Sequence, residues 1–171
     1  MVFNIYILTM AARIYFQLPL LSRVREFNLG GQPVPRLTKN EDVCITCHRC
    51  ETICAWVHNI VFNPKRGRVI IDLDYPDEHR IRICIQCGRC ADACPMDAIY
   101  QDFNILTTSE QGIYRLDEGK CTGCGKCIEA CPTKVLQFYP DKRVPRKCDF
   151  CLGQPMCVRY CPTRALGWVL G

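Results

Sequence analysis

The spacing of the cysteines constrains this chain more than any other feature of its sequence. Two central stretches repeat one pattern, C-x-x-C-x-x-C-x-x-x-C-P, first at Cys84, Cys87, Cys90 and Cys94, and again at Cys121, Cys124, Cys127 and Cys131. Pro95 and Pro132 follow the fourth cysteine of each run. Chance does not readily produce two such patterns in tandem, so they mark one kind of site used twice.

Two further runs flank the central pair, and each departs from the pattern at one point. The first run is Cys44, Cys47, Cys50 and Cys54, followed by Ala55 in place of proline. The last run is Cys148, Cys151, Cys157 and Cys161, with five residues instead of two between its second and third cysteines. All sixteen cysteines of the 171 residues therefore fall into groups of four.

This spacing is typical of the ligand loop of a 4Fe–4S cluster, in which the fourth cysteine binds the other cluster of a pair. Three thiolates separated by two residues let one tight loop surround one side of the cube. Gly88, Gly123 and Gly125 let the backbone approach inorganic sulfide closely, and the proline after the fourth cysteine interrupts a local helix. The longer gap in the last run still lets its loop reach a cube. The sequence predicts four 4Fe–4S clusters.

Other uses of so many cysteines fit the spacing less well. Disulfides are common in short, cysteine-rich secreted chains, but triplets with two-residue gaps give poor geometry for several bridges. Zinc sites usually combine two C-x-x-C pairs across a long spacer. The formal net charge of +5 does not indicate nucleic-acid binding, because four clusters of about −2 each would make the loaded protein negative. No nucleic-acid-binding module is visible in the sequence.

Crossed ligation assigns the cysteines to four quartets. Quartet 3 is Cys84, Cys87, Cys90 and Cys131, and quartet 4 is Cys94, Cys121, Cys124 and Cys127. If the outer runs pair in the same way, quartet 1 is Cys44, Cys47, Cys50 and Cys161, and quartet 2 is Cys54, Cys148, Cys151 and Cys157. The central pair of clusters would then be inserted in the outer pair.

We therefore predict an α+β, ferredoxin-like fold of two bicluster modules. Residues 41–78 and 138–171 would form the outer module, residues 79–137 the central module inserted in it, and residues 1–40 an N-terminal extension. Strands are expected beside the cysteine loops at residues 68–74, 79–83, 98–102, 112–116 and 135–139. Short helices are expected after the third cysteine of each run, for example at residues 89–94 and 126–131.

Residues 1–21 form an apolar run that Arg13 interrupts near its middle. A spanning helix needs about 20 mainly apolar residues with few charges, so no membrane span is predicted. A secretory signal needs a basic segment before its apolar core, and no Lys or Arg precedes Arg13. We expect a helix or extended arm packed on a partner subunit, with translation from Met10 as an alternative. A cytoplasmic location is expected, since cluster proteins rarely occupy disulfide-forming compartments.

Several segments carry a family resemblance: Cys-His-Arg-Cys-Glu at residues 47–51, Phe-Asn-Pro-Lys-Arg-Gly-Arg at 62–68, Lys-Cys-Asp-Phe-Cys at 147–151, and the segments at 84–88, 120–125, 154–158 and 161–163. Through them residues 41–167 resemble four-cluster iron–sulfur subunits of multi-subunit oxidoreductases. The chain is most similar to small subunits that accompany tungsten- or molybdenum-pterin enzymes of the aldehyde:ferredoxin oxidoreductase family, which includes tungsten benzoyl-CoA reductases. The five-residue gap favours this group over subunits of the dimethyl-sulfoxide and nitrate reductase type.

The resemblance implies a large pterin-containing catalytic subunit as partner, and a further subunit or ferredoxin that accepts or donates electrons. No catalytic site of the chain's own is predicted, because His48, His58 and His79 lie in no nucleophile–base pattern and there is no P-loop or dinucleotide fingerprint. His48 and His58 are expected to pack or hydrogen-bond near a cluster. We predict an electron-transfer subunit; the alternatives are a free-standing polyferredoxin, a subunit of a hydrogenase or molybdopterin reductase complex, and a redox or iron sensor.

Overall fold

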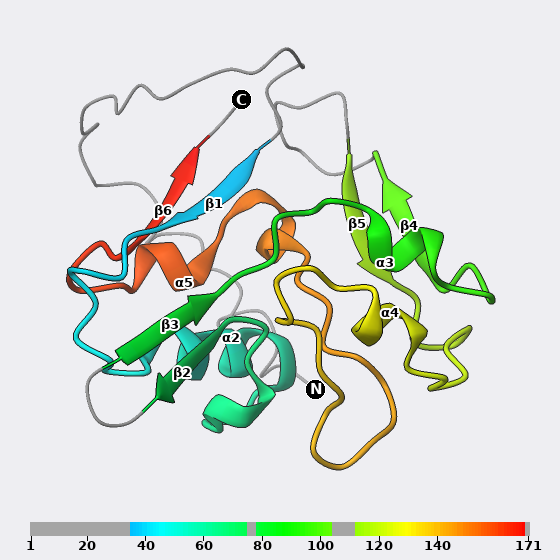
Figure 1. Cartoon of the computed structure of the whole chain (residues 1–171), viewed down its shortest axis with the longest axis horizontal. Coiled ribbons are helices and arrows are strands. Elements are labelled where there is room, and N and C mark those ends of the chain that lie inside the picture. The colour runs from blue at the N-terminus through cyan, green and yellow to red at the C-terminus, as the bar shows by residue number, and fades with distance from the viewer. Residues whose placement is uncertain (1–34, 75–77, 104–111, 170–171) are drawn as a thin grey trace, which may run out of the picture. The chain divides into compact units, whose positions relative to one another are not determined.

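The computed structural model describes residues 35–74, 78–103 and 112–169 (Figure 1). The arm predicted for residues 1–21 lies outside the described residues. Within the three described ranges, short helices and two-stranded sheets alternate along the chain, which is the mixed α+β architecture that the sequence predicts. In these ranges no helix combines the length and the apolar character that crossing a bilayer requires.

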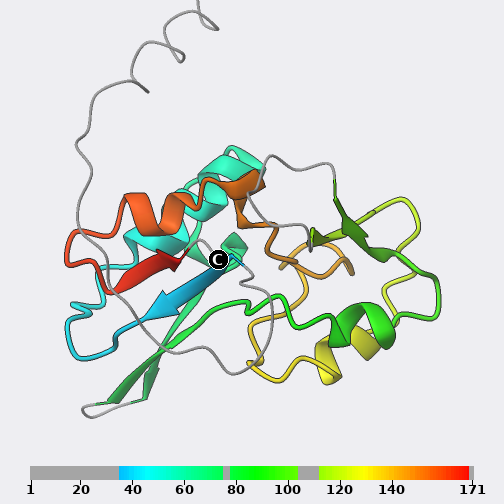
Figure 2. The same cartoon turned by 90° about the horizontal axis from the view of Figure 1, so that it is seen from above.

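The described strands form three antiparallel pairs. β2 (Ile70–Asp74) pairs with β3 (Glu78–Arg82), and β4 (Ile99–Asp102) pairs with β5 (Ile113–Leu116). These four strands begin and end within two residues of the predicted ones. The third pair joins β1 (Arg36–Lys39) to β6 (Leu166–Val169), two segments that lie side by side although they are far apart in sequence (Figure 2). Neither β1 nor β6 is among the predicted strands.

The strand predicted at residues 135–139 is not formed. Phe138 makes only an isolated antiparallel bridge with Pro145, and beside it the amide of Arg146 donates to the carbonyl of Gln137 at 2.8 Å. On the other side of the bridge, the amide of Tyr139 donates to the carbonyl of Val144 at 3.0 Å. The pairing extends no further than this single bridge, so the strand prediction was wrong.

Each cysteine run leads into a helix, and the third cysteine lies in its first turn. α2 spans Arg49–Asn59, α3 Arg89–Asp92, α4 Lys126–Glu129 and α5 Met156–Arg159, with 3-10 turns at Pro64–Arg66 (η1) and Phe150–Gly153 (η2). α2 has 11 residues, whereas α3, α4 and α5 have four each. α3 and α4 end two residues before the predicted limits.

The buried side chains form two clusters. The larger core combines aliphatic residues of β1, β2, β3 and β6 with Phe150 and the buried cysteines Cys50, Cys54 and Cys157. The smaller core consists of Cys90, Ile99, Cys127, Cys131, Val135 and Leu136. Because cysteines make up half of the smaller core, its packing depends on the sites that the cysteines form.

Candidate iron–sulfur centres

The backbone around the second cysteine repeats one conformation in the first three runs. The residue before it has a positive φ, at Thr46 (50°), Gln86 (54°) and Gly123 (70°), and so has the residue after it, at His48 (55°), Gly88 (79°) and Gly125 (86°). Turns of this kind direct successive N–H groups to one side and form concavities that bind anions, including many iron–sulfur sites. Thr46, His48 and Gln86 adopt it at a cost of roughly 1–2 kcal/mol each, so the loop shape is kept even where no glycine supplies it.

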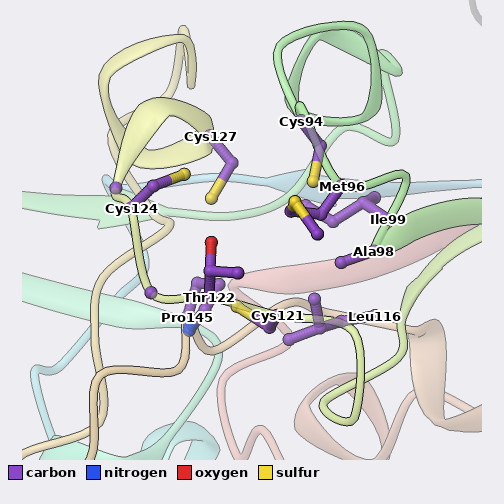
Figure 3. A pocket seen from close by; sticks show the side chains of 12 residues that line it. Cys94, Met96, Ala98, Ile99, Leu116, Cys121, Thr122, Cys124, Cys127 and Pro145 are labelled. Carbon is purple, nitrogen blue, oxygen red and sulfur yellow. The ribbon is translucent and has the colours of Figure 1, made fainter.

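Quartet 4 lines one pocket. The thiol sulfurs of Cys94, Cys121, Cys124 and Cys127 lie around this space, together with the thioether sulfur of Met96 (Figure 3). Cys94 comes from the preceding run, and apolar side chains such as Ile99 complete the wall. Burial is the main cause that raises the pKa of Cys127 to about 11, and the charges of Cys90 and the other cysteines add to it. Four sulfur donors around one space suit a soft metal centre such as a 4Fe–4S cluster.

The cysteines of quartet 3 border the same small core. Cys131 is buried in it together with Cys90, and Cys84 packs against them, whereas Cys87 is exposed. Burial is the main cause that raises the pKa of Cys90 to about 11; the charge of Lys147 opposes this shift, and Cys84 and Cys87 increase it. The structure thus brings Cys131, from the second central run, into the core that holds Cys90 of the first.

The cysteines of the first and last runs meet in the larger core. Cys50, Cys54 and Cys157 are buried there, and Cys44, Cys148 and Cys161 pack against it. Burial is the main cause that raises the pKa of Cys50 to about 12, with the charge of Cys161 among the further causes. Burial also raises the pKa of Cys54 to about 11, with the charge of Cys151 among the further causes. The thiols of Cys50 and Cys54 therefore each lie near a thiol of the last run.

These donor sets fit iron–sulfur clusters. All sixteen cysteines are free thiols in the structure, and burial disfavours the thiolate form of those with raised pKa values. Bound iron supplies the positive charge that stabilises such thiolates, and metal binding releases their protons. The sixteen sulfur donors are consistent with four 4Fe–4S clusters. Cys47, Cys87 and Cys124 are exposed, whereas every member of quartet 2 is buried or half-buried.

Several hydrogen bonds reach the cysteine sulfurs from groups that the sequence did not single out. The amide of Arg68 donates to Cys54 Sγ at 3.2 Å, and the amide of Gln86 lies 3.4 Å from Cys84 Sγ. Two threonines, each two residues after a Cys-Pro cysteine, place a hydroxyl by its sulfur: Thr133 at 3.6 Å from Cys131 and Thr163 at 3.8 Å from Cys161. The repeated Cys-Pro-Thr sequence was the available signal for the threonines.

His58 lies beside a cysteine, as expected for packing near a cluster. Its Nε2 is 3.5 Å from Cys151 Sγ and 3.5 Å from Asp149 Oδ1, and Arg68 forms an ion pair with the same carboxylate at 2.9 Å. Burial, reinforced by the charge of Arg68, lowers the pKa of His58 to about 4, so the ring is neutral near pH 7. His48 instead bonds through Nδ1 to the buried carboxylate of Glu51.

Comparison with known proteins agrees with this chemistry. Three models described as 4Fe-4S dicluster domains match residues 43–99, 83–135 and 113–162. Protein NrfC of Escherichia coli K12 is 32% identical over 123 residues, which cover 67% of this chain and 52% of NrfC. A ferredoxin of Butyribacterium methylotrophicum is 49% identical over 39 residues, 23% of this chain and 54% of that protein. The chain thus spans about half the length of these curated relatives.

Among solved structures, the chain is similar to one from the active site complex BamBC of benzoyl-coenzyme A reductase in complex with benzoyl-CoA, with a TM-score of 0.49 and 26% identity. The similarity covers 81% of this chain and 80% of that one. The matched domains and the sixteen cysteines place the chain among the iron–sulfur proteins built from 4Fe-4S dicluster domains.

Proposed function

We propose that this chain relays single electrons through four 4Fe–4S clusters, between a tungsten- or molybdenum-pterin catalytic subunit and a second redox partner. The observation that carries the proposal is the gathering of cysteines from separate runs around common sites. The pocket that Cys94 shares with Cys121, Cys124 and Cys127 is the plainest instance. When bound, each cluster supplies a one-electron couple whose potential depends on its surroundings.

The four quartets derived from crossed ligation are the proposed ligand sets. Quartet 1 is supported by the effect of Cys161 on the pKa of Cys50, and quartet 2 by the effect of Cys151 on the pKa of Cys54. The pairing of β6 with β1, which lies just before residue 41 in the predicted extension, supports an outer module built from segments on both sides of the central runs, with the central module inserted in it. In this arrangement the chain fixes the clusters, buries them, and donates hydrogen bonds to their sulfurs.

Exposed apolar side chains near exposed cysteines support docking of partners at two places. Ile45, two residues before Cys47, is 61% exposed, and Phe62, which follows α2 and stacks on Trp56, is 70% exposed. In the central module, Ile85 precedes the exposed Cys87 and is itself 48% exposed. Contiguous exposed apolar surface favours contact with another protein. A relay needs two such contacts, one for each partner.

Anoxic purification of the full chain from its native source tests the proposal. We expect about sixteen irons per chain and co-purification, at a fixed ratio, with a large subunit that contains tungsten or molybdenum. All clusters should be reduced reversibly without loss of iron. Iron far below this amount, or zinc in its place, would contradict the cluster assignment. Full iron with no pterin subunit would instead identify a free-standing polyferredoxin.

A further inference from the structure

Lys147 is a buried lysine that contacts both Cys84 of the first central run and Cys148 of the last run. Only 3% of its surface is exposed, and it directly precedes Cys148 of the last run. Its Nζ donates to three acceptors: Cys84 Sγ at 3.4 Å, Gln86 Oε1 at 3.2 Å and the carbonyl oxygen of Cys148 at 2.8 Å. An ammonium has three N–H donors, so these acceptors use its full capacity.

The setting of this ammonium calls for a compensating negative charge. Burying a charged group is strongly unfavourable unless it is both paired with an opposite charge and hydrogen-bonded, and two of the three acceptors are uncharged oxygens. The third is the sulfur of a proposed cluster ligand. Burial raises the pKa of Cys90 and of Cys148, and the charge of Lys147 opposes both shifts. The ammonium therefore acts on cysteines of the central and of the last run, and it donates directly to Cys84 Sγ.

Gln86 holds the ammonium in place. Its side-chain Oε1 accepts from Lys147 and from the amide of Tyr114 at 3.0 Å, and its Nε2 donates to the carbonyl of Cys148 at 2.8 Å. Gln86 is itself buried. The network connects residues on either side of the boundary between the central and the outer runs, and leaves the lysine little freedom to move away.

We propose that Lys147 is a positioning residue for electron transfer between the two modules: its fixed positive charge raises the reduction potential of the cluster held by Cys84, Cys87 and Cys90. This inference rests on the proposed relay function. Reduction adds one negative charge to a cluster, and a nearby cation in a poorly screened interior favours the more negative form. Since Lys147 bonds to Cys84 Sγ but only to the main chain of Cys148, the effect on quartet 3 exceeds that on quartet 2.

The test is a potentiometric titration, followed by electron paramagnetic resonance, of the full chain with anaerobically assembled clusters. Lys147→Met removes the charge and keeps an unbranched side chain. We expect the equilibrium constant for adding an electron to one cluster to fall at least about tenfold, which equals about 59 mV for a one-electron couple. The charge-keeping variant Lys147→Arg should retain most of the original potential.

Lys126→Met is the matched control, because it removes the same charge beside a cysteine, Cys127, from an exposed position. Water and salt screen exposed charges, so all potentials should stay close to those of the original protein. Potentials unchanged in Lys147→Met, with full iron, would overturn the inference and leave the relay intact. If Lys147→Met loses a cluster, retention in Lys147→Arg supports the role of the charge, and loss in both variants assigns Lys147 to packing and overturns it.

Discussion

The first cysteine run and the two central runs have the same spacing, yet they build helices of different length. α2 continues for 11 residues, past Cys54 and as far as Asn59, while α3 and α4 stop after four. Ala55 follows Cys54, whereas Pro95 and Pro132 follow the corresponding cysteines. Proline disfavours the helical conformation of the residue before it and cannot continue the helix. One residue after the fourth cysteine thus decides whether the chain continues or turns away.

The longer helix α2 brings polar side chains to the outer runs, whereas the central runs are followed by tight turns. Its second half carries His58 to Cys151 and Asp149, and the Glu51 carboxylate in its first turn accepts the amide of Ile71 at 2.8 Å. After the Cys-Pro sequences the chain turns instead through a residue with positive φ, at Asp97 (47°), Lys134 (52°) and Arg164 (56°). The larger core, with 12 buried residues against six in the smaller one, is correspondingly less dependent on cysteines.

Removal of iron should have the largest effect and should abolish the difference between the modules. The folding free energy of small metal-dependent domains comes largely from metal binding. Isolated helices shorter than roughly 12–15 residues are at best marginally stable in water, and α2 has only 11 residues. We expect anoxic chelation to unfold both modules, measured by circular dichroism and limited proteolysis. A protease-resistant apo-fragment containing α2 would show that the larger core folds without clusters.

Serine substitution of the fourth cysteines should show whether both modules use crossed ligation. Cys54→Ser should remove about a quarter of the iron by destroying the cluster of quartet 2. Adding Cys151→Ser to it should cause no further loss, whereas adding Cys47→Ser should remove about a second quarter. Metal analysis and the spin-coupled signals of the reduced protein measure this. The reverse order of losses would mean that each run holds its own cluster.

In the central module the matched pair is Cys94→Ser with Cys124→Ser, which should lose no more iron than Cys94→Ser alone. Cys94→Ser with Cys87→Ser should lose about twice as much. A result that differs between the two modules would show that only one of them uses crossed ligation.

The helix-length comparison is tested by exchanging the residues after the fourth cysteine. Ala55→Pro places proline inside α2, where Ala55 is fully buried, and should lower the free energy of unfolding by about 3 kcal/mol. Pro95→Ala should lower it by only about 0.4–1 kcal/mol, through greater freedom of the unfolded chain. Anoxic denaturant titration followed by circular dichroism measures both. Equal losses would show that the continuation of α2 contributes little.

The threonines after the two Cys-Pro sequences should give small effects of nearly equal size. Thr133→Val and Thr163→Val remove the hydroxyls near Cys131 Sγ and Cys161 Sγ. Each should lower the free energy of unfolding by about 1 kcal/mol, as is typical for a hydrogen bond. Serine at either position serves as the control, because it keeps the hydroxyl. A much larger loss at one position would show that the two Cys-Pro-Thr turns are not equivalent.

The sequence predicted the parts of this molecule that depend on local spacing. The short helices after the third cysteines and the strands β2 to β5 follow from cysteine periodicity and from β-branched runs near the loops. The β1–β6 pair was missed because strand pairing over such a separation leaves no local pattern, and its four-residue strands are too short to recognise. The network of Lys147 and Gln86 was missed for a similar reason, since its members meet only in the folded chain.

The β1–β6 pairing also has a consequence for biosynthesis. β1 is made before its partner β6, which is the last described element of the chain. Chains fold during synthesis largely from the N-terminal side, so the cysteines of the central runs, Cys84 to Cys131, leave the ribosome before those of the last run. With the proposed quartets, the outer clusters can be completed only after translation has passed Cys161, and a pause before that point would leave Cys44 to Cys54 as unprotected thiols.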